Sequence, residues 1–97
     1  MITWSVYLLR CADNSLYCGI STNLDRRVNE HNYSKSKGAK YTKARRPVKL
    51  VYFEVVESRS HASQREYQLR QLTKHQKEAL ITAFHALHTL PSSVINE

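Results

Sequence analysis

The sequence predicts an α+β fold, sandwich-like, in which a small three-stranded, mostly antiparallel sheet is flanked by about three helices. Three observations support this prediction. The chain opens with two β-rich stretches joined by a polar turn. A third β-rich stretch lies at 48–56, and three stretches with helical periodicity surround it. A chain of 97 residues supports one modest core, so no second domain is expected.

The first two strands should pair as a hairpin. Residues 2–10 are rich in β-branched and aromatic side chains, and residues 16–20 return after the turn at 12–15. The turn contains Asp and Asn, which tolerate the backbone shapes that a tight turn requires. An antiparallel hairpin would bring Tyr7 and Tyr17 into the same neighbourhood.

A first helix is expected to start within residues 21–25 and to run to about His31. Thr22 can cap its start, and Asp25 stands three residues later in a capping-box-like position. At about 100° per residue, Arg27 and His31 fall on the inward apolar stripe of this helix. The sequence therefore turns an arginine and a histidine toward the core.

A second helix is expected over residues 61–71, with Ser60 as its N-cap. Ala62, Glu66 and Leu69 lie within about 60° of one another on this helix. A carboxylate therefore shares the apolar stripe of the second helix.

Thr73 and Gln76 have the spacing of a capping box at the start of a third helix. Its expected apolar face consists of Leu80, Ala83, Phe84 and Leu87. We expect residues 1–90 to form the single domain. Pro91 and the polar residues after it predict a flexible tail over 91–97.

The composition narrows the class of protein. No apolar run approaches the roughly 20 residues of a membrane span, and no signal-peptide pattern opens the chain, so a cytoplasmic protein is expected. Cys11 and Cys18 fall in or beside strands and should be reduced and close to the core. The histidines lack the spacing that a zinc site with two cysteines would need.

The net charge of +7 is concentrated in one connection, because no acidic residue occurs between His31 and Phe53. The basic residues there are Lys35, Lys37, Lys40, Lys43, Arg45, Arg46 and Lys49. Such a run is usually a solvated loop. Here it is interleaved with Ser, Thr, Gly and Tyr, which is typical of contacts to a phosphate backbone. We expect the first six to bind nucleic acid, although an anionic membrane would fit the charge equally well.

Arg27, His31 and Glu66 are polar residues on apolar helix faces, where burial without a partner costs several kcal/mol. One interpretation is a structural ion pair between Arg27 and Glu66. The other is a wet cleft for phosphodiester cleavage, which needs a carboxylate for Mg²⁺ or Mn²⁺, an arginine for the developing charge and a base for the attacking water. A tyrosine, with an ordinary pKa of about 10, would need positive charge nearby to serve as that base.

Two short motifs, Val6-Tyr7 and Tyr17-Cys18-Gly19, occupy the two strands of the predicted hairpin. Three more polar positions follow them in order, namely Arg27, His31 and Glu66. Over roughly residues 3–78 this set resembles the GIY-YIG nuclease superfamily, where the motifs read Ile-Tyr and Tyr-Ile-Gly. The stretches 26–32 and 38–42 resemble most closely its small stand-alone bacterial members, the YhbQ-like group, and the catalytic subunit of a eukaryotic nuclease that cuts branched DNA.

The resemblance implies the GIY-YIG fold and a role for each position. Glu66 would be the sole protein ligand of one divalent metal, Mg²⁺ or Mn²⁺. Tyr7 would activate the water, with His31 able to share its proton. Tyr17 would orient the scissile phosphate or a metal-bound water. Arg27 would stabilise the charge that develops on the phosphate.

The sequence differs from the family pattern at three places. Ser5 replaces the first glycine of the name motif, and Cys18 replaces a usual Ile or Val. The stretch 71–78 lacks an asparagine that many family nucleases carry after the metal-binding glutamate.

The favoured interpretation is a metal-dependent endonuclease acting on DNA, with branched, nicked or single-stranded DNA in repair or recombination as the expected substrate. The missing asparagine favours an alternative, a non-catalytic nucleic-acid-binding module with the same fold. RNA remains open as a partner, as does a second protein that supplies substrate choice. The sequence leaves the oligomeric state open.

Overall fold

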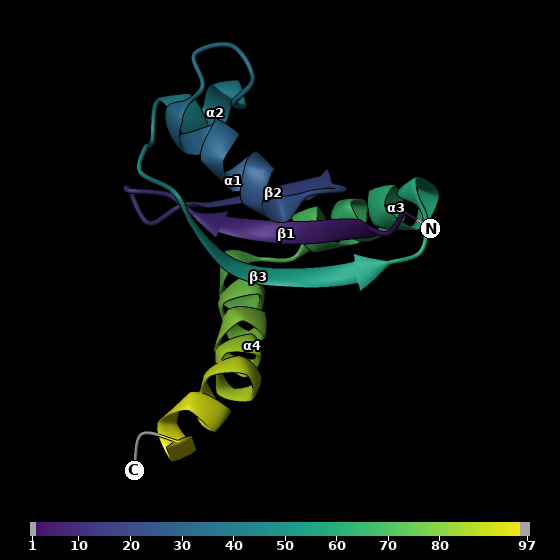
Figure 1. Ribbon diagram of the computed structural model, residues 1–97, viewed down its shortest axis with the longest axis vertical. Coiled ribbons are helices and arrows are strands. Elements are labelled where there is room, and N and C mark those ends of the chain that lie inside the picture. The colour runs from purple at the N-terminus through teal and green to yellow at the C-terminus, as the bar shows by residue number, and fades with distance from the viewer. Residues whose placement is uncertain (1, 96–97) are drawn as a thin grey trace.

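The computed structural model describes residues 2–95, and the side chains of residues 2–88 (Figure 1). It has three strands and four helices in the order β-β-α-α-β-α-α. The elements are β1 (Trp4–Arg10), β2 (Leu16–Ser21), α1 (Leu24–Tyr33), α2 (Lys40–Lys43), β3 (Lys49–Val56), α3 (Arg59–Gln71) and α4 (Lys74–Ile95). The α+β architecture is confirmed, and the short helix α2 is an addition inside the basic connection.

The sheet has the order β2-β1-β3, and both pairings are antiparallel. The β1–β2 turn includes Asn14 at φ 68°, a left-handed conformation that asparagine adopts more readily than most residues. In the β1–β2 register, Tyr7 lies opposite Gly19 and Leu9 lies opposite Tyr17. Because side chains alternate along a strand, Tyr7 and Tyr17 share one face of the sheet.

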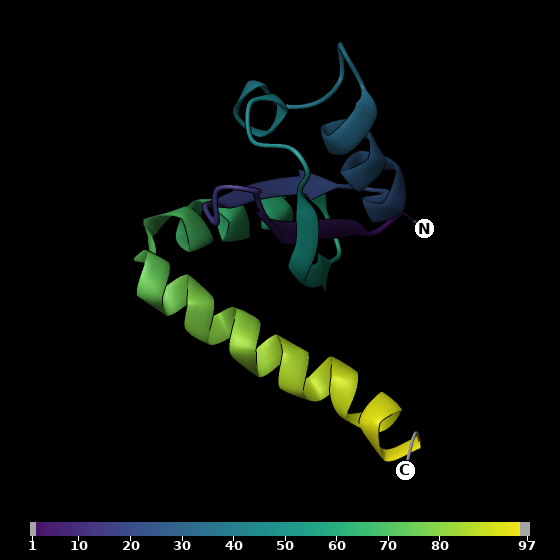
Figure 2. The same cartoon turned by 90° about the vertical axis from the view of Figure 1, so that its left-hand side faces the viewer.

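Helices cover both faces of the sheet (Figures 1 and 2). On one face, Val6 and Leu8 pack with α3 and α4 residues that include Ala62 and Leu69. On the other face, the buried cluster contains Tyr7, Leu9, Cys11 and Val48, against which Leu24 and Val28 of α1 pack. The two tyrosines of the sequence motifs therefore lie under α1, and α3 lies on the opposite side of the sheet.

The N-caps of two helices differ from the predicted ones. The N-cap of α1 is Asn23, whose side chain accepts the backbone N–H of Arg26 at 3.0 Å. The N-cap of α3 is Ser58. The predictions of Thr22 and Ser60 as N-caps were wrong. In each case a residue of equal capping ability lies within two positions and caps the helix instead.

Helix α4 begins with the predicted capping box, in which Thr73 and Gln76 exchange side chain–backbone hydrogen bonds of 2.9 and 3.1 Å. Its predicted apolar face is buried only in part. Leu80 and Phe84 pack against the core, but Ala83 is exposed. Ile81 is only 4% exposed, whereas Leu87 is 74% exposed. Figure 2 shows that α4 runs away from the sheet toward its C-terminal end.

Helix α4 has 22 residues and continues past Pro91 to Ile95, so the predicted end of regular structure near residue 90 is too early. Residues 96–97 of the predicted tail lie outside the described residues. Within the described part of the chain, no helix combines the length and the apolar character that crossing a bilayer requires.

Candidate active site

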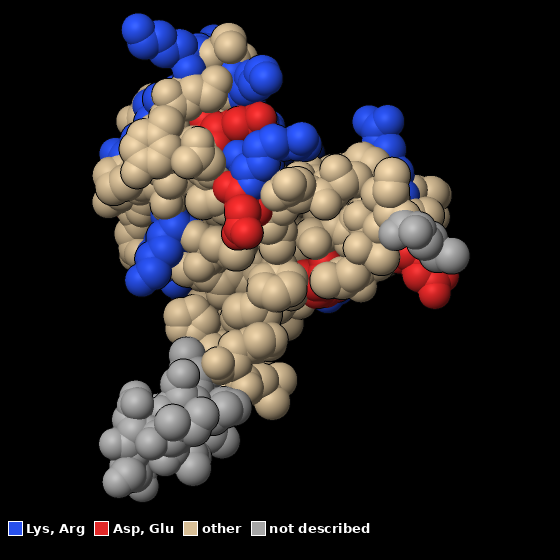
Figure 3. Space-filling view, in the orientation of Figure 1, with Lys and Arg blue, Asp and Glu red and all other residues tan. Residues whose placement is uncertain are grey.

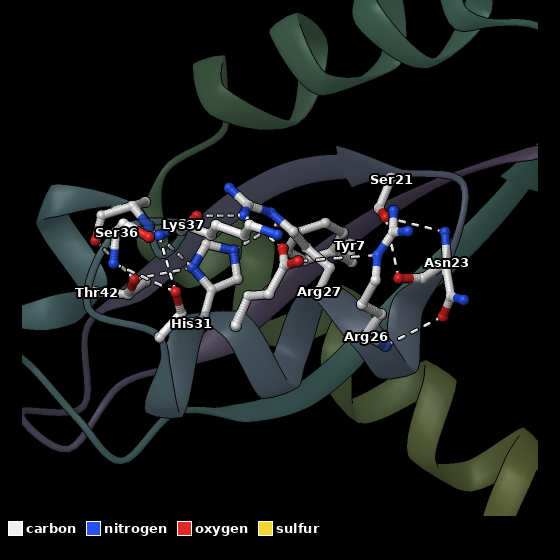
Figure 4. A network of polar contacts seen from close by, with 12 residues as sticks. Tyr7, Ser21, Asn23, Arg26, Arg27, His31, Ser36, Lys37 and Thr42 are labelled. Atoms are coloured by element: carbon white, nitrogen blue, oxygen red, sulfur yellow. Dashed lines mark hydrogen bonds and ion pairs between the residues drawn. The ribbon is translucent and has the colours of Figure 1, made fainter.

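A chain of hydrogen bonds connects the sheet to α1 and α2. The hydroxyl of Tyr7, on β1, lies 2.9 Å from Nε2 of His31, on α1. On the other side of the imidazole, Nδ1 lies 2.8 Å from the hydroxyl of Thr42, on α2. All three side chains are at most 1% exposed. Figure 4 shows the imidazole between the other two residues, with Arg27 alongside.

The hydrogen bonds around Thr42 indicate the tautomer of His31. The hydroxyl of Thr42 donates to the carbonyl oxygen of Ala39 at 2.9 Å, so its oxygen is available to accept the proton of Nδ1. The backbone N–H of Ala39 also faces Nδ1, but at the longer distance of 3.4 Å. We therefore assign the proton of neutral His31 to Nδ1, which leaves Nε2 to accept from the phenol of Tyr7.

Gly19 provides the space in which the phenol of Tyr7 lies. A Cβ atom at Gly19 would stand 2.4 Å from the hydroxyl oxygen of Tyr7 and 2.5 Å from its Cζ. Any other residue at this position would push the ring away from His31. The glycine of the Tyr17-Cys18-Gly19 motif thus has a steric role across the strand pair.

Tyr17 lies beside the same imidazole. Its ring centroid is 5.2 Å from that of His31, in an edge-on arrangement. It also stacks with Tyr41 of α2, with centroids 5.9 Å apart, and the guanidinium of Arg45 lies 3.8 Å from the centre of the Tyr41 ring. Tyr17 is half-buried, so part of it faces solvent at the edge of the sheet.

Arg27 lies next to Tyr7, but its ion-pair partner is not Glu66. Its Nη1 donates to Glu30 Oε1 at 3.1 Å and to the carbonyl oxygen of Lys37 at 2.6 Å. The proposed structural pair with Glu66 is therefore not the arrangement present. A guanidinium has five N–H donors, so others remain for a phosphate.

Burial and charge set the protonation of this group. Burial raises the pKa of Tyr7 to about 12, and the neighbouring Arg27 guanidinium only partly opposes it. Burial lowers the pKa of His31 to about 4, and the positive charges of Arg27 and Arg46 act in the same direction. At neutral pH the free protein therefore holds a neutral phenol against a neutral imidazole.

Glu66 lies on α3, which packs on the opposite face of the sheet from α1. Its backbone oxygen lies 4.0 Å from the sulfur of Cys18. Its carboxylate charge contributes to the raised pKa of Tyr17, and also to that of Cys18, after burial in both cases. Tyr17 thus lies near enough to Glu66 for the charge of the carboxylate to act on its phenol.

The surroundings of Glu66 fit a single hard cation. The carboxylate is half-buried, and within residues 2–88 no hydrogen bond or ion pair engages it. Among the described residues there is no group of three or more His, Cys, Asp or Glu that could hold a metal. A lone carboxylate suits Mg²⁺, which keeps several waters and takes one or two protein carboxylates, and does not suit zinc.

Comparison with known proteins identifies the domain. The model of the GIY-YIG catalytic domain matches residues 3–79. The chain belongs to the GIY-YIG family. Two relatives of this GIY-YIG protein are UPF0213 proteins of Desulfotalea psychrophila, 54% identical over 82% of this chain and 72% of the relative, and of Clostridium perfringens, 50% identical over 80% and 82%.

Solved structures agree with the GIY-YIG assignment. The solution structure of a UPF0213 protein from Bacillus halodurans is 38% identical, with 84% of each chain covered and a TM-score of 0.53. A protein from E. faecalis, also solved in solution, is 40% identical, with 86% of each chain covered and a TM-score of 0.57. GIY-YIG is a nuclease family, so the chain carries the domain of an endonuclease.

The basic connection of this GIY-YIG domain contains two arginines bound within the protein and several exposed lysines. Arg46 is structural, because its guanidinium donates to the carbonyl oxygens of Glu30, His31 and Ser34 at 3.2, 2.5 and 2.5 Å. Arg45 pairs with Asp13 at 3.0 Å. These two arginines, predicted to bind nucleic acid, are engaged within the protein.

The lysines of the connection are exposed. The Nζ of Lys43 donates to the carbonyl oxygen of Lys35 at 2.5 Å, whereas Lys37 and Lys40 have no side-chain partner within residues 2–88. In Figure 3, basic side chains project at the top of the molecule, over α2 and the loop before it. This surface keeps the charge that the sequence assigns to nucleic-acid binding.

Proposed function

We propose that this GIY-YIG protein is a metal-dependent endonuclease that hydrolyses DNA phosphodiester bonds, with the phenol of Tyr7 receiving the proton of the attacking water. The observation that carries the proposal is the buried hydrogen bond from Tyr7 to His31, braced from behind by Thr42. This contact gives the phenol a neutral nitrogen acceptor at 2.9 Å, which is the arrangement that a proton relay through Tyr7 requires.

The proton transfer has two parts. The attacking water gives a proton to the hydroxyl oxygen of Tyr7, while Tyr7 gives its own proton to Nε2 of His31. The hydroxide oxygen then forms the new bond to phosphorus as the bond to the leaving oxygen breaks. The leaving oxygen departs with the bonding electron pair and takes a proton from solvent. The imidazolium that results keeps its Nδ1 proton bonded to Thr42. Such positioned acid–base groups contribute roughly 10²- to 10⁴-fold to a rate.

Arg27 couples this transfer to substrate binding. Its positive charge, after burial, holds the pKa of His31 at about 4. A phosphate bound to Arg27 would offset that charge and raise the affinity of His31 for a proton. The same guanidinium would stabilise negative charge on the phosphate oxygens in the transition state. Tyr17, beside the imidazole and at the sheet edge, would orient the phosphate.

Glu66 would hold the divalent cation, with waters completing the coordination sphere. A bound divalent cation would act as a Lewis acid and supply positive charge against the negative charge that develops on the phosphate. Glu66 is the residue that would hold the cation, and its charge acts on the neighbouring phenol of Tyr17. Mg²⁺ or Mn²⁺ fits an all-oxygen site of this kind.

DNA is the proposed substrate, in branched, nicked or single-stranded forms that arise in repair or recombination. The proposed location of the protein is the cytoplasm.

A non-catalytic binding module is the second candidate. The engagement of Arg27 with Glu30 favours it, since a phosphate must compete with that carboxylate. The absence of an asparagine from residues 71–78 favours it too.

Incubation with structured DNAs and Mg²⁺ or Mn²⁺ tests the proposal. The wild-type protein should cut, and Glu66→Ala should bind DNA without cutting it. Glu57→Ala is the matched control, because Glu57 is an exposed carboxylate in the turn before α3. Salt-sensitive binding with no metal-dependent product would identify the binding module instead. Cleavage that survives Glu66→Ala would refute the role of this carboxylate.

A further inference from the structure

Two adjoining cavities, of about 260 and 280 Å³, form one groove along the edge strand β2. Leu16, Tyr41 and Lys77 line both. The inner cavity continues to Tyr17 and Arg70, and the outer one to Lys74. The groove therefore starts beside the candidate active site and leads away from it, between α2 on one side and α3 and α4 on the other.

The groove is positively charged. Its cations are Arg70, Lys74 and Lys77, on α3 and α4, outside the basic run of the sequence. Within residues 2–88, neither Arg70 nor Lys77 forms an ion pair. The one carboxylate of the lining is Asp13, which is bound to Arg45 at 3.0 Å. No free negative charge within the lining offsets the two unpaired cations.

Charge also links the groove to the site. The positive charge of Arg70 acts on the phenol of Tyr17, opposing the effect of burial on its pKa. Glu66 stands one helical turn before Arg70 on α3, so the proposed cation ligand and the first groove cation follow each other on the helix. A phosphate chain positioned at Tyr17 would meet Arg70 next and Lys77 after it.

We propose that this groove binds a single strand of nucleic acid through its phosphodiester backbone, with Arg70 and Lys77 contacting successive phosphates on one side of the scissile bond. The inference rests on the proposed function and adds the path of the strand. The rings of Tyr17 and Tyr41 line the inner cavity, and the bases of an unpaired strand stack on aromatic rings of this kind. This lining favours a single strand over a duplex.

Salt dependence of binding tests the groove. Affinity for a labelled single-stranded oligonucleotide is measured in EDTA at several salt concentrations, so that no cleavage occurs. Each phosphate contact contributes about 0.7 to the log–log slope for a single strand. Arg70→Gln and Lys77→Gln should each lower the slope by about that amount. Arg59→Gln, at the opposite end of α3, should leave it unchanged. Unchanged slopes in both groove variants would overturn the proposal.

A titration followed by amide NMR keeps the test independent of variant folding. In the wild-type protein, binding should shift the backbone signals of Leu16, Tyr41 and Lys77. Shifts confined to the loop around Lys35 and Lys37 would overturn the groove. If the groove shifts appear but no metal yields a product, the endonuclease proposal fails and the groove stands. If the protein cleaves DNA but the salt slopes of the groove variants are unchanged, the groove proposal is refuted and the endonuclease proposal stands.

Discussion

Tyr7 and His31 are joined by a 2.9 Å hydrogen bond although they lie 24 residues apart, on a strand and on a helix. The contact depends on a glycine across the strand pair and on a threonine behind the imidazole. Neither partner is charged at neutral pH, because burial moves both pKa values away from it. The pair is thus poised for a transfer that requires a bound substrate.

Removal of the Thr42 hydroxyl should change which ring nitrogen of His31 carries the proton. In Thr42→Val, which keeps the shape, Nδ1 loses its acceptor and the proton should move to Nε2. We expect kcat to fall about 10- to 100-fold with KM little changed. ¹⁵N NMR of the imidazole should report the change of tautomer, and Thr42→Ser should restore both properties. A tautomer that stays the same in Thr42→Val would refute the assignment.

The pH dependence of stability should carry the signature of His31. Its pKa, about 4 in the folded protein, lies below the ordinary 6.5, so between these values only the unfolded chain takes up the proton. Stability should therefore fall as the pH drops from 6.5 to 4, by up to about 3 kcal/mol from this residue. Urea unfolding of His31→Gln should lack this component. An equal decline in both proteins across that window would contradict the predicted pKa.

Substitution of Gly19 should act on Tyr7. The Cβ of Gly19→Ala would overlap the phenol, which must then leave Nε2 of His31. We expect a loss of stability of about 1–3 kcal/mol and a loss of activity as large as that of Tyr7→Phe. The double variant should be hardly less active than either single one, because both break the same contact. Additive losses in a single-turnover assay would show that Gly19 acts elsewhere.

Periodicity in the sequence predicts much of this arrangement. The spacing of Arg27 and His31 predicts that they face the sheet, and His31 is fully buried there. The β-rich stretches predict the hairpin that pairs Tyr7 with Gly19. The cap of α1 was not predictable, because Thr22 and Asn23 are neighbours with the same capping ability.

Contacts through irregular segments could not be predicted. Thr42 reaches His31 from α2, a helix of four residues inside a connection that has no periodicity of its own. Glu30 pairs with Arg27 on the same helix, at a spacing that also allows pairs at the surface. The groove cations on α3 and α4 meet Tyr41 only through the tertiary fold. These cations lie outside the basic run of the sequence, so the charge pattern of the sequence does not single them out.

Arg46 illustrates the same limit and yields a further prediction. In the sequence it is one of several cations, yet its guanidinium binds three carbonyl oxygens near the end of α1. Arg46→Ala should therefore lower the free energy of unfolding by about 2–4 kcal/mol. Lys37→Ala, with an exposed side chain, should change it by less than about 0.5 kcal/mol. Equal stability of the two variants in chemical denaturation would contradict the bracing role of Arg46.

Single-turnover cleavage of a branched DNA by Tyr7→Phe, with enzyme in excess and Mg²⁺ present, tests the central claim most directly. The variant keeps the ring and its packing but has no hydroxyl to accept a proton from water. Our account predicts wild-type DNA affinity and a cleavage rate at least about 100-fold lower. Cleavage by Tyr7→Phe at the wild-type rate would contradict it.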